Sequence, residues 1–226
     1  MARLFVVGTP IGNLGDITLR ALDVLRGVDV IVCEDTRVTK RLLDKYDIKK
    51  PLKSYHAQSG QMKVKQIIDL LESEKDIALV SDAGTPTISD PGVLLVQKIK
   101  KELPEVEIIT IPGASALTSA LSISGLSASD FLFLGFLPHK KGRETLFNEI
   151  KGSKRTVVFY ESTHRIIKTL EKLSKILAPS RKIVVARELT KIYEECISGT
   201  PTEIISYFHD YTAKQKGEFV VLVEGA

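Results

Sequence analysis

The sequence is poor in the residues that build metal sites and disulfide-stapled domains. It holds only two cysteines and four histidines among 226 residues. Cys33 and Cys196 cannot form a disulfide framework, which favours a reducing compartment. The histidines are scattered, with no H-x-x-x-H or C-x-x-C pair, so we expect no metal site.

Long apolar runs are also missing. No stretch reaches the roughly 18 consecutive apolar residues that a membrane helix needs. The opening MARLFVVGTP leads from a short apolar run straight into Gly and Pro, unlike a signal peptide. We therefore expect a soluble, cytoplasmic protein that makes no use of a membrane.

Several nucleotide and hydrolase motifs are absent. There is no G-x-x-x-x-G-K-[ST] and no G-x-S-x-G, which argues against a P-loop ATPase and an esterase. The first glycine-rich segment has Gly8, Gly12 and Gly15, with Pro10 at the second glycine position of the dinucleotide fingerprint, so it fits that fingerprint poorly. The net charge of +4 permits an anionic partner without requiring one.

What is present is a regular alternation of short β-branched runs and helical patterns in the first half. Strands are predicted over 4–7, 28–33, 53–56, 77–80 and 107–111, and helices over 17–26, 39–46, 63–74, 92–103 and 114–124. Strands separated by helices indicate parallel βαβ units, because a parallel connection needs a crossover.

The second half has a different pattern. Strands are predicted over 131–137, 156–161, 182–190, 193–199 and 218–225, and helices over 143–150, 164–177 and 200–208. The third and fourth of these strands are too close for a helix between them, so they should be antiparallel. Thr200 and Pro201 suit the N-cap and the first position of the last helix.

The small, polar stretch SGLSASD separates the two patterns. We therefore predict an α/β protein with a parallel-type N-terminal domain over 1–124 and a mixed-sheet C-terminal domain over 125–226.

Four loops of the first half directly follow strands: 8–16, 34–37, 81–92 and 112–116. In a parallel sheet the carboxyl ends of the strands share one edge, where ligands bind. The loop SDAGTPTISDPG, over 81–92, is too long and too rich in Gly and Pro for a simple turn. Glycines allow close backbone approach to a ligand and prolines stiffen the loop. The alternative is that these loops are ordinary turns.

A set of ordered motifs covers nearly the whole chain: VGTPIGNLGDITLRAL, SDAGTPTISDPG, IPGASA, GFLP, FYESTHR, ARELTK and KGEFVVLVEG. Together they resemble the ribosomal small-subunit methyltransferase I family of the tetrapyrrole-methylase superfamily. The resemblance implies a two-domain class III fold and an S-adenosylmethionine (SAM) enzyme that methylates the 2′-hydroxyl of a cytidine in the decoding region of 16S rRNA. It also implies a homodimer, with SAM between the domains, no metal and no DNA. Relatives often have a further C-terminal segment, whereas the present sequence ends at Ala226.

The resemblance also suggests residues that contact the cofactor. Most lie in the strand-end loops of the first half, and two lie in FYES and ARELTK of the second half. They are Ile11, Gly12, Gly84, Thr85, Pro86, Ile88, Ser115, Ala116, Glu161 and Leu189. Thr85 stands where many members of the superfamily have Asp.

Candidate catalytic residues lie in the segment ARELTK. Methyl transfer to a hydroxyl needs a nearby base or cation, and Arg187, Glu188 and Lys191 are suitable. The alternative is ordinary salt bridges at a strand end. In the segment EDTR, Arg37 could bind the acceptor, or the segment could simply cap the next helix through Asp35 or Thr36.

A basic loop is the candidate RNA contact. His139, Lys140, Lys141 and Arg143 lie in LPHKKGR, and Arg165 lies in the same half. The alternative is a solvated loop and a first helical turn. Tyr55 and Tyr160 are possible base-stacking residues, with burial favoured for Tyr160 because it lies within a strand.

Two other functions remain open at this point. One is a methyltransferase acting on a porphyrin-like small molecule, and the other is a module that binds SAM or a nucleotide without turnover. The basic loop and the ARELTK match favour RNA.

Overall fold

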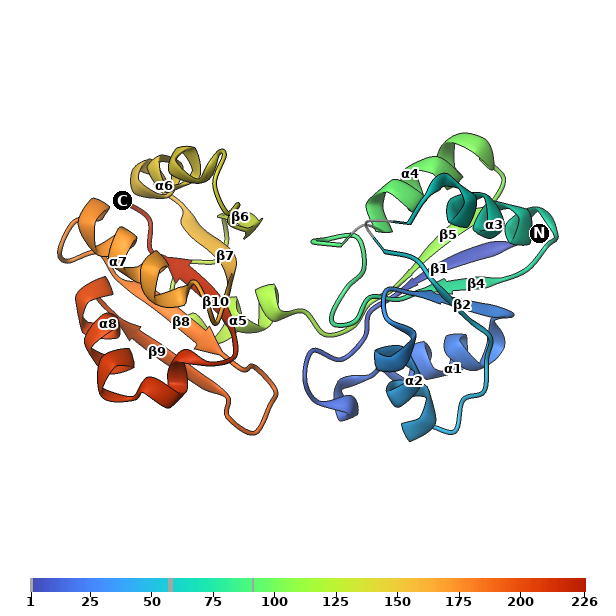
Figure 1. Cartoon of the computed structure of the whole chain (residues 1–226), viewed down its shortest axis with the longest axis horizontal. Coiled ribbons are helices and arrows are strands. Elements are labelled where there is room, and N and C mark those ends of the chain that lie inside the picture. Colours follow the sequence, from blue (N-terminus) through green and yellow to red (C-terminus); the bar gives the residue numbers. More distant parts are fainter. Residues whose placement is uncertain (1, 57–58, 91) are drawn as a thin grey trace. The chain divides into compact units, whose positions relative to one another are not determined.

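The computed structural model describes residues 2–56, 59–90 and 92–226, and it divides into two compact units, Met1–Ser115 and Ala116–Ala226 (Figure 1). Among these described residues, no helix combines the length and the apolar character needed to cross a membrane.

The first unit is built on a five-stranded sheet. Its strands are β1 (Arg3–Val7), β2 (Val30–Cys33), β3 (Leu52–Ser54), β4 (Ile77–Leu79) and β5 (Glu107–Ile111). Their order is β3-β2-β4-β1-β5, and every pairing is parallel. The predicted parallel βαβ architecture is therefore confirmed.

Helices cover both faces of this sheet. They are α1 (Leu19–Gly27), α2 (Thr36–Lys45), α3 (Gln61–Glu72) and α4 (Gly92–Glu102), with a short 3-10 turn η1 (Leu14–Asp16). Helices α1 and α2 lie on one side of the sheet and α3 and α4 on the other (Figure 1). Side chains of α1 and α2 share one hydrophobic cluster with the sheet, and those of α3 and α4 share another. Covering on both sides explains why β2 and β4 are continuous buried apolar runs rather than alternating ones.

Polar residues fix where two of these helices begin. The Thr18 side chain accepts a hydrogen bond from Ala21 N at the start of α1, and the Asp35 carboxylate accepts one from Arg37 N at the start of α2. The cap at Asp35 confirms one reading of EDTR. It also starts α2 earlier than the expected helix over 39–46.

The second unit has a mixed sheet. Its strands are β6 (Phe131–Phe136), β7 (Thr156–Ser162), β8 (Ile183–Arg187), β9 (Glu195–Gly199) and β10 (Glu218–Val223), in the order β6-β7-β10-β8-β9. The β6–β7 pair is parallel and the other pairs are antiparallel, as predicted for β8 and β9.

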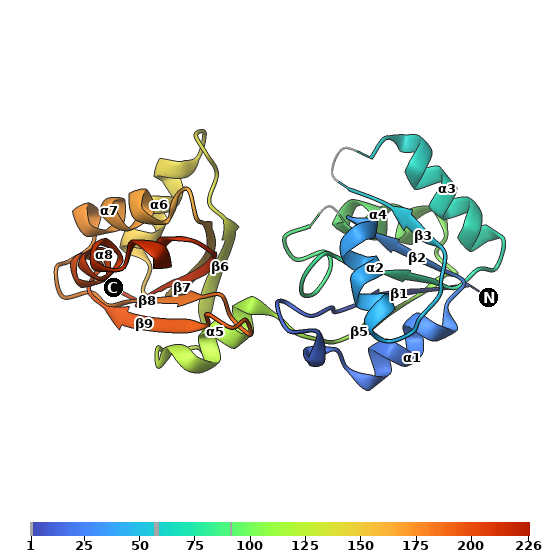
Figure 2. The ribbon, with the colours of Figure 1, turned by 60° about the horizontal axis from the view of Figure 1, so that its bottom comes forward.

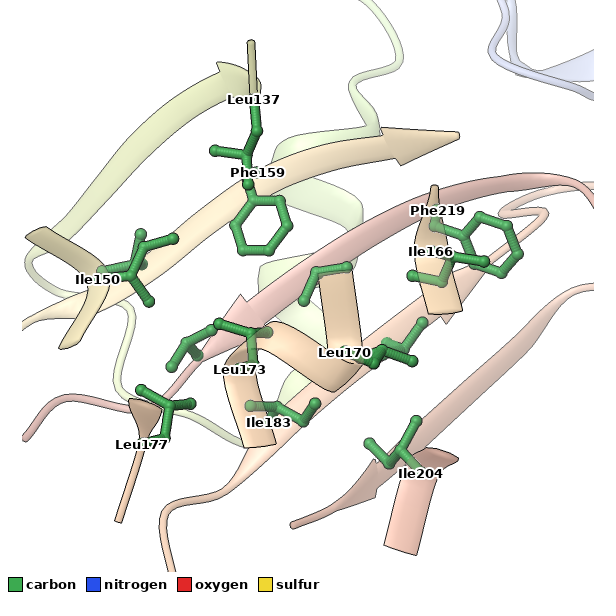
Figure 3. Close-up of a cluster of buried hydrophobic side chains, with 14 of the residues drawn as sticks. Leu137, Ile150, Phe159, Ile166, Leu170, Leu173, Leu177, Ile183, Ile204 and Phe219 are labelled. Carbon is green, nitrogen blue, oxygen red and sulfur yellow. The ribbon is translucent and has the colours of Figure 1, made fainter. Parts of the chain in front are cut away.

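One face of the second sheet carries the core. The helices α6 (Arg143–Gly152), α7 (Ile166–Ile176) and α8 (Pro201–Asp210) pack there, followed by a short turn η2 (Thr212–Gln215). Leu170 and Leu173 of α7 lie in one buried cluster with Phe159 and Ile183 of the sheet (Figure 3). Thr200 caps α8 through a capping box with Glu203, which confirms the predicted cap.

Helix α5 (Ala116–Ser124) lies on the opposite face of the second sheet, against β10, β8 and β9 (Figure 2). The structural division falls between Ser115 and Ala116 for this reason. The boundary expected from composition, at residue 124, places α5 in the first domain instead.

Candidate functional site

The carboxyl edge of the first sheet gathers four loops. They follow β1, β2, β4 and β5, and these strands are neighbours in the sheet. Within the loop over 81–92, Pro91 lies outside the described residues. The prediction that these loops share one edge is confirmed by the strand order.

Backbone hydrogen bonds join the loop after β1 to the loop after β4. Thr9 N donates to Gly84 O over 2.9 Å, and Gly84 N donates to Thr9 O over 3.1 Å. The buried Thr9 hydroxyl adds a hydrogen bond to Ser81 O over 3.1 Å. Two loops that are far apart in sequence therefore form one rigid backbone frame.

Gly84 is the point where three of the loops meet. Its φ of +80° lies in the left-handed region, which glycine adopts without strain. A Cβ at this position would lie 3.5 Å from Ile11 Cγ2 and 3.6 Å from Ala114 O. Any side chain added at Gly84 would therefore project among the loops after β1, β4 and β5.

The residues predicted to contact the cofactor differ in exposure around this point. Ile11 and Pro86 are buried, Thr85 is half-buried, and Gly12 and Ile88 are exposed. Glycines and apolar side chains of mixed exposure are residue types that allow close backbone approach and apolar contact to a ligand. The predicted contacts of these loops with the cofactor stay predictions.

Thr87, in the same loop, has a strained backbone. Its φ is +75°, which is rare for a β-branched residue. A Cβ at Gly92 would lie 3.2 Å from Thr87 Cγ2, so Gly92 leaves room for this unusual conformation. Strain that the surrounding structure holds in place is concentrated at functional sites.

A group of carboxylates lies beside these loops, at the ends of β2 and β4. Burial, together with the nearby charges of Asp90 and Asp82, raises the pKa of Glu34 to about 7. Burial also raises the pKa of Asp90. In the sequence, Glu34 stands out only as part of EDTR and as an acid at the end of the second strand, where a dinucleotide site has its ribose-binding acid. The signal that could have singled it out is an acid directly after a buried strand, facing acids of the next loop.

Arg37 lies on the surface at the start of α2. Its guanidinium Nη2 is 2.6 Å from Asp35 Oδ2, and its side chain is 88% exposed. Hydrogen bonds from Arg37 lower the pKa of Asp35 to about 2. Asp35 is therefore ionised and engaged in capping, while Arg37 still presents most of its surface to solvent.

In the second unit, the segment ARELTK forms the turn after β8. Arg187 is buried, and it donates to Lys216 O over 2.8 Å and to Tyr193 O over 3.0 Å. These bonds hold together the segments on either side of the turn. The guanidinium of Arg187 is thus occupied by backbone carbonyls.

Glu188 and Lys191 form a charged pair within this turn. Lys191 Nζ lies 3.0 Å from Glu188 Oε1 and 2.8 Å from Glu218 Oε2. Burial opposes the charge on Lys191, but the hydrogen bonds to Glu218 and Glu188 outweigh it and raise its pKa. Burial likewise opposes the charge on Glu188, but hydrogen bonds from Glu218 N and Lys191 lower its pKa overall. Both groups are therefore charged at neutral pH.

The backbone of this turn is also strained. Glu188 has a φ of +50° and Thr190 a φ of +66°. Gly217 packs beneath Glu188, and a Cβ there would come within 2.7 Å of Glu188 Cγ. Leu189, the predicted cofactor contact between the two strained residues, is buried.

Glu161 of β7 is the centre of a buried ionic network. Its side chain is fully buried, and Oε2 accepts from the Thr169 hydroxyl over 2.7 Å. Arg165 Nε lies 3.2 Å from Oε1, and Arg143 Nη2 lies 3.6 Å from Oε2. Burial and the charge of Arg165 lower the pKa of Arg143.

Both arginines also hold the start of the basic loop. Arg165 Nη2 donates to Leu137 O over 2.5 Å, and Arg143 Nη1 donates to Pro138 O over 3.1 Å. The predicted contacts of Arg143 and Arg165 with phosphate stay predictions, and so does the contact of Glu161 with a cofactor. The other basic-loop candidates, His139, Lys140 and Lys141, are exposed.

Comparison with known proteins gives the family. The tetrapyrrole (corrin/porphyrin) methylases match residues 3–205. Ribosomal RNA small subunit methyltransferase I of Thermotoga maritima is 47% identical over 225 residues, which cover 100% of this chain and 99% of the relative. The chain belongs to the ribosomal RNA small subunit methyltransferase I family.

Other relatives of the same name agree with this assignment. The protein of Halalkalibacterium halodurans is 47% identical over 98% of this chain and 75% of its own length, and that of Escherichia coli O157:H7 is 44% identical over 99% and 78%. This family consists of SAM-dependent methyltransferases, so the chain is a methyltransferase with SAM as methyl donor.

Solved structures with this fold are more distant in sequence. Cobalt precorrin-4 methyltransferase CbiF has a TM-score of 0.72 at 18% identity, covering 98% of this chain and 94% of that one. The methyltransferase CobJ has a TM-score of 0.72 at 20% identity, covering 100% and 95%. These likenesses show the two-domain tetrapyrrole-methylase fold, as predicted.

The structure gathers the cofactor candidates of this methyltransferase into separate groups. Ile11 of the loop after β1 lies next to Gly84 of the loop after β4, whereas Ser115 and Ala116 lie at the division between the units. Glu161 and Leu189 belong to the second unit. Among the described residues, no group of three or more His, Cys, Asp or Glu is arranged to hold a metal ion.

Proposed function

We propose that this methyltransferase transfers a methyl group from SAM to the 2′-hydroxyl of a cytidine in 16S rRNA, within the small ribosomal subunit, without a metal. The observation that carries the proposal is 47% identity over the whole chain to a relative named ribosomal RNA small subunit methyltransferase I. Because its substrate is part of the bacterial ribosome, the enzyme works in the cytoplasm. It acts as a homodimer, which doubles the surface available to RNA.

The loops around Gly84 hold the cofactor. When bound, SAM supplies a methyl group on a positively charged sulfur, which is the reactive part of the chemistry. Ile11, Gly12 and Ile88 contribute apolar surface and open backbone, and Thr85 contributes a hydroxyl. Ser115, Ala116 and Leu189 complete the contacts. The carboxylate of Glu161 is engaged with Thr169 and two arginines, so the contact in that segment falls to backbone groups.

The acceptor hydroxyl must lose its proton as its oxygen attacks. Glu34, beside the loops that hold the cofactor, takes the role of proton acceptor, because burial and the nearby charges of Asp90 and Asp82 raise its pKa to about 7. Lys191 serves as a fixed cation rather than a base, since its raised pKa keeps it protonated. Glu188 and Arg187 hold the turn that presents Lys191.

Phosphate binding falls to exposed side chains. Lys140, Lys141 and His139 extend from the basic loop, and Arg37 extends from the start of α2. Arg143 and Arg165 contribute by anchoring the loop through Leu137 O and Pro138 O. Because the lysines contact phosphate in this proposal, their loss should reduce the salt dependence of RNA binding.

Labelled SAM offered with alternative acceptors tests the proposal. We expect incorporation into small-subunit particles that depends on the enzyme, and SAM binding in calorimetry that persists in the presence of a chelator. Incorporation into a tetrapyrrole acceptor, with none into rRNA, would support a small-molecule methyltransferase instead. Binding of SAM without incorporation into either acceptor would indicate a non-catalytic module.

A further inference from the structure

Strand β6 contains an irregularity that changes which side chains share a face. Phe133 pairs with Val158 of β7, but the next pairing joins Phe136 to Tyr160. Three steps along β6 therefore match two steps along β7. Gly135, with a φ of +61°, lies within this bulge.

In a regular strand, residues three positions apart point to opposite faces. The extra residue cancels this alternation, so Phe133 and Phe136 both reach the ring of Tyr160. The ring centroids of Phe133 and Tyr160 are 5.1 Å apart, and those of Phe136 and Tyr160 are 5.3 Å apart. We call these three residues the aromatic cluster.

The aromatic cluster is on the side of the sheet away from the core. Leu132 and Leu134 of β6 pack against the hydrophobic core beneath α6, α7 and α8. The helix on the opposite face, α5, packs mainly against β10, β8 and β9 rather than at the β6 edge. The Phe136 side chain is 58% exposed, and Phe133 and Tyr160 are half-buried. The sequence favoured burial for Tyr160, and the structure shows that this residue is only half-buried.

The chain continues from Phe136 directly into the basic loop. The base of that loop is fixed, because the carbonyls of Leu137 and Pro138 accept hydrogen bonds from Arg165 and Arg143. Lys140 and Lys141 follow within a few residues and are exposed. An exposed phenyl ring and two exposed cations therefore lie within five residues of one another along an anchored segment.

We propose that the aromatic cluster stacks against a nucleobase of single-stranded rRNA, while Lys140 and Lys141 neutralise phosphates of the same strand. The inference rests on the proposed function and adds a base-binding site to it. Every base has a flat apolar face that an aromatic side chain can stack on, and unpaired rRNA exposes such faces. The positive charges of Lys140 and Lys141 complement the negative phosphates of a nucleic acid strand, whereas an apolar protein surface offers them no opposite charge.

Tryptophan fluorescence provides a direct test, because the natural chain contains no tryptophan. The variant Phe136→Trp places a single reporter in the aromatic cluster. We expect its emission to be quenched by a short oligocytidylate and much less by an abasic oligonucleotide of equal length and charge. The matched control is Tyr211→Trp, an exposed aromatic position of the same unit beside Lys214, whose emission should not change.

Binding to small-subunit particles separates stacking from charge. We expect Phe136→Ala to weaken binding about tenfold with an unchanged salt slope, and Phe136→Tyr to restore it. Lys140→Ala and Lys141→Ala should each reduce the salt slope by about one. SAM affinity should remain that of the natural chain in all these variants.

Three results would overturn the inference. The first is an emission from Phe136→Trp that responds equally to the abasic strand. The second is unchanged particle binding by Phe136→Ala. The third is a change in the sedimentation of Phe136→Ala with normal RNA binding, which would assign the aromatic cluster to contact with a second copy of the chain. If the natural chain methylates rRNA while any of these occurs, only the inference fails. If the natural chain neither binds nor methylates rRNA, the proposed function fails as well.

Discussion

Gly8 and Gly113 lie backbone to backbone: a Cβ on Gly8 would approach Gly113 N to 2.8 Å, and a Cβ on Gly113 would approach Gly8 O to 2.8 Å. Gly8 follows β1 and Gly113 follows β5, so this contact joins two strand-end loops. With the Thr9–Gly84 bridge, it makes the loops at the carboxyl edge one connected frame. Close packing between the two loops therefore requires glycine at positions 8 and 113.

The first prediction follows from this contact. Replacing Gly8 by Ala should lower the free energy of unfolding by about 2 kcal/mol, because the loop after β5 must shift to admit the methyl group. Urea unfolding measures the change. Gly27→Ala is the control, because a Cβ there meets nothing within 4 Å and should be neutral or stabilising. Equal stability of the two variants would contradict the close packing.

The second prediction concerns Gly84 and the cofactor. Gly84→Ala should weaken SAM binding by at least about tenfold in calorimetry, because the new methyl group projects among the three loops. The matched control is Gly125→Ala, which has a similar φ of +70° but open space around its Cβ. Both variants should lose comparable stability through backbone strain. Normal SAM affinity in folded Gly84→Ala would reduce the loop over 81–92 to a structural turn.

The third prediction separates chemistry from binding at Lys191. Lys191→Met should lower kcat by ten- to a hundredfold, an order-of-magnitude expectation for loss of a positioned charge, with SAM affinity nearly unchanged. Lys191→Arg, which keeps the charge, should recover part of the rate. Reduced SAM affinity with normal turnover at saturation would show that Lys191 serves the cofactor instead.

The fourth prediction concerns the buried ionic network. Glu161→Gln should cost about 3 kcal/mol or more of stability, because two largely buried arginines lose their shared carboxylate. The control Glu144→Gln removes an exposed ion pair with Lys172 and should cost less than about 1 kcal/mol. Similar costs for the two variants in urea unfolding would show that the network contributes little.

The fifth prediction is a pH dependence at Glu34. Its pKa is raised from 4.5 to about 7 on folding, so its ionisation destabilises the folded state increasingly from pH 4.5 to pH 7. Glu34→Gln should therefore match the natural chain near pH 4 and be more stable by roughly 1 kcal/mol at pH 8. Because Glu34 is partly exposed, solvent screens its charge, so the gain in the free energy of unfolding stays well below the value equivalent to the full pKa shift. A stability difference that does not vary with pH would contradict the raised pKa.

Much of the fold could be predicted from the sequence, because local patterns determined it. The alternation of apolar runs and helical stripes predicted both sheets, and the Thr200–Pro201 pair predicted the start of α8. The loops that directly follow strands were predicted to share one edge of the first sheet, and the strand order confirms this, whereas ligand binding at that edge stays a prediction. These features depend on neighbours along the chain, which a sequence displays directly.

Features that depend on distant partners could not be predicted in this way. Arg143 looks like a surface cation in LPHKKGR, and only the fold brings it to Glu161 and Thr169. The alignment of Phe133 with Phe136 depends on a bulge that periodicity does not reveal. The raised pKa of Glu34 depends on Asp82 and Asp90 of another loop. In each case a tertiary contact changes the meaning of a local motif.

The most direct test of the central claim is the chemical position of the transferred methyl group. Small-subunit particles labelled with the enzyme and methyl-labelled SAM would be hydrolysed in alkali, which cleaves RNA only where the 2′-hydroxyl is free. If the enzyme methylates the 2′-hydroxyl of one cytidine, the label remains in a single alkali-resistant dinucleotide containing cytidine, and a 2′-deoxycytidine at that position abolishes incorporation. Label released in a mononucleotide, which alkali produces wherever the 2′-hydroxyl is free, or no incorporation at all, would contradict 2′-O-methylation.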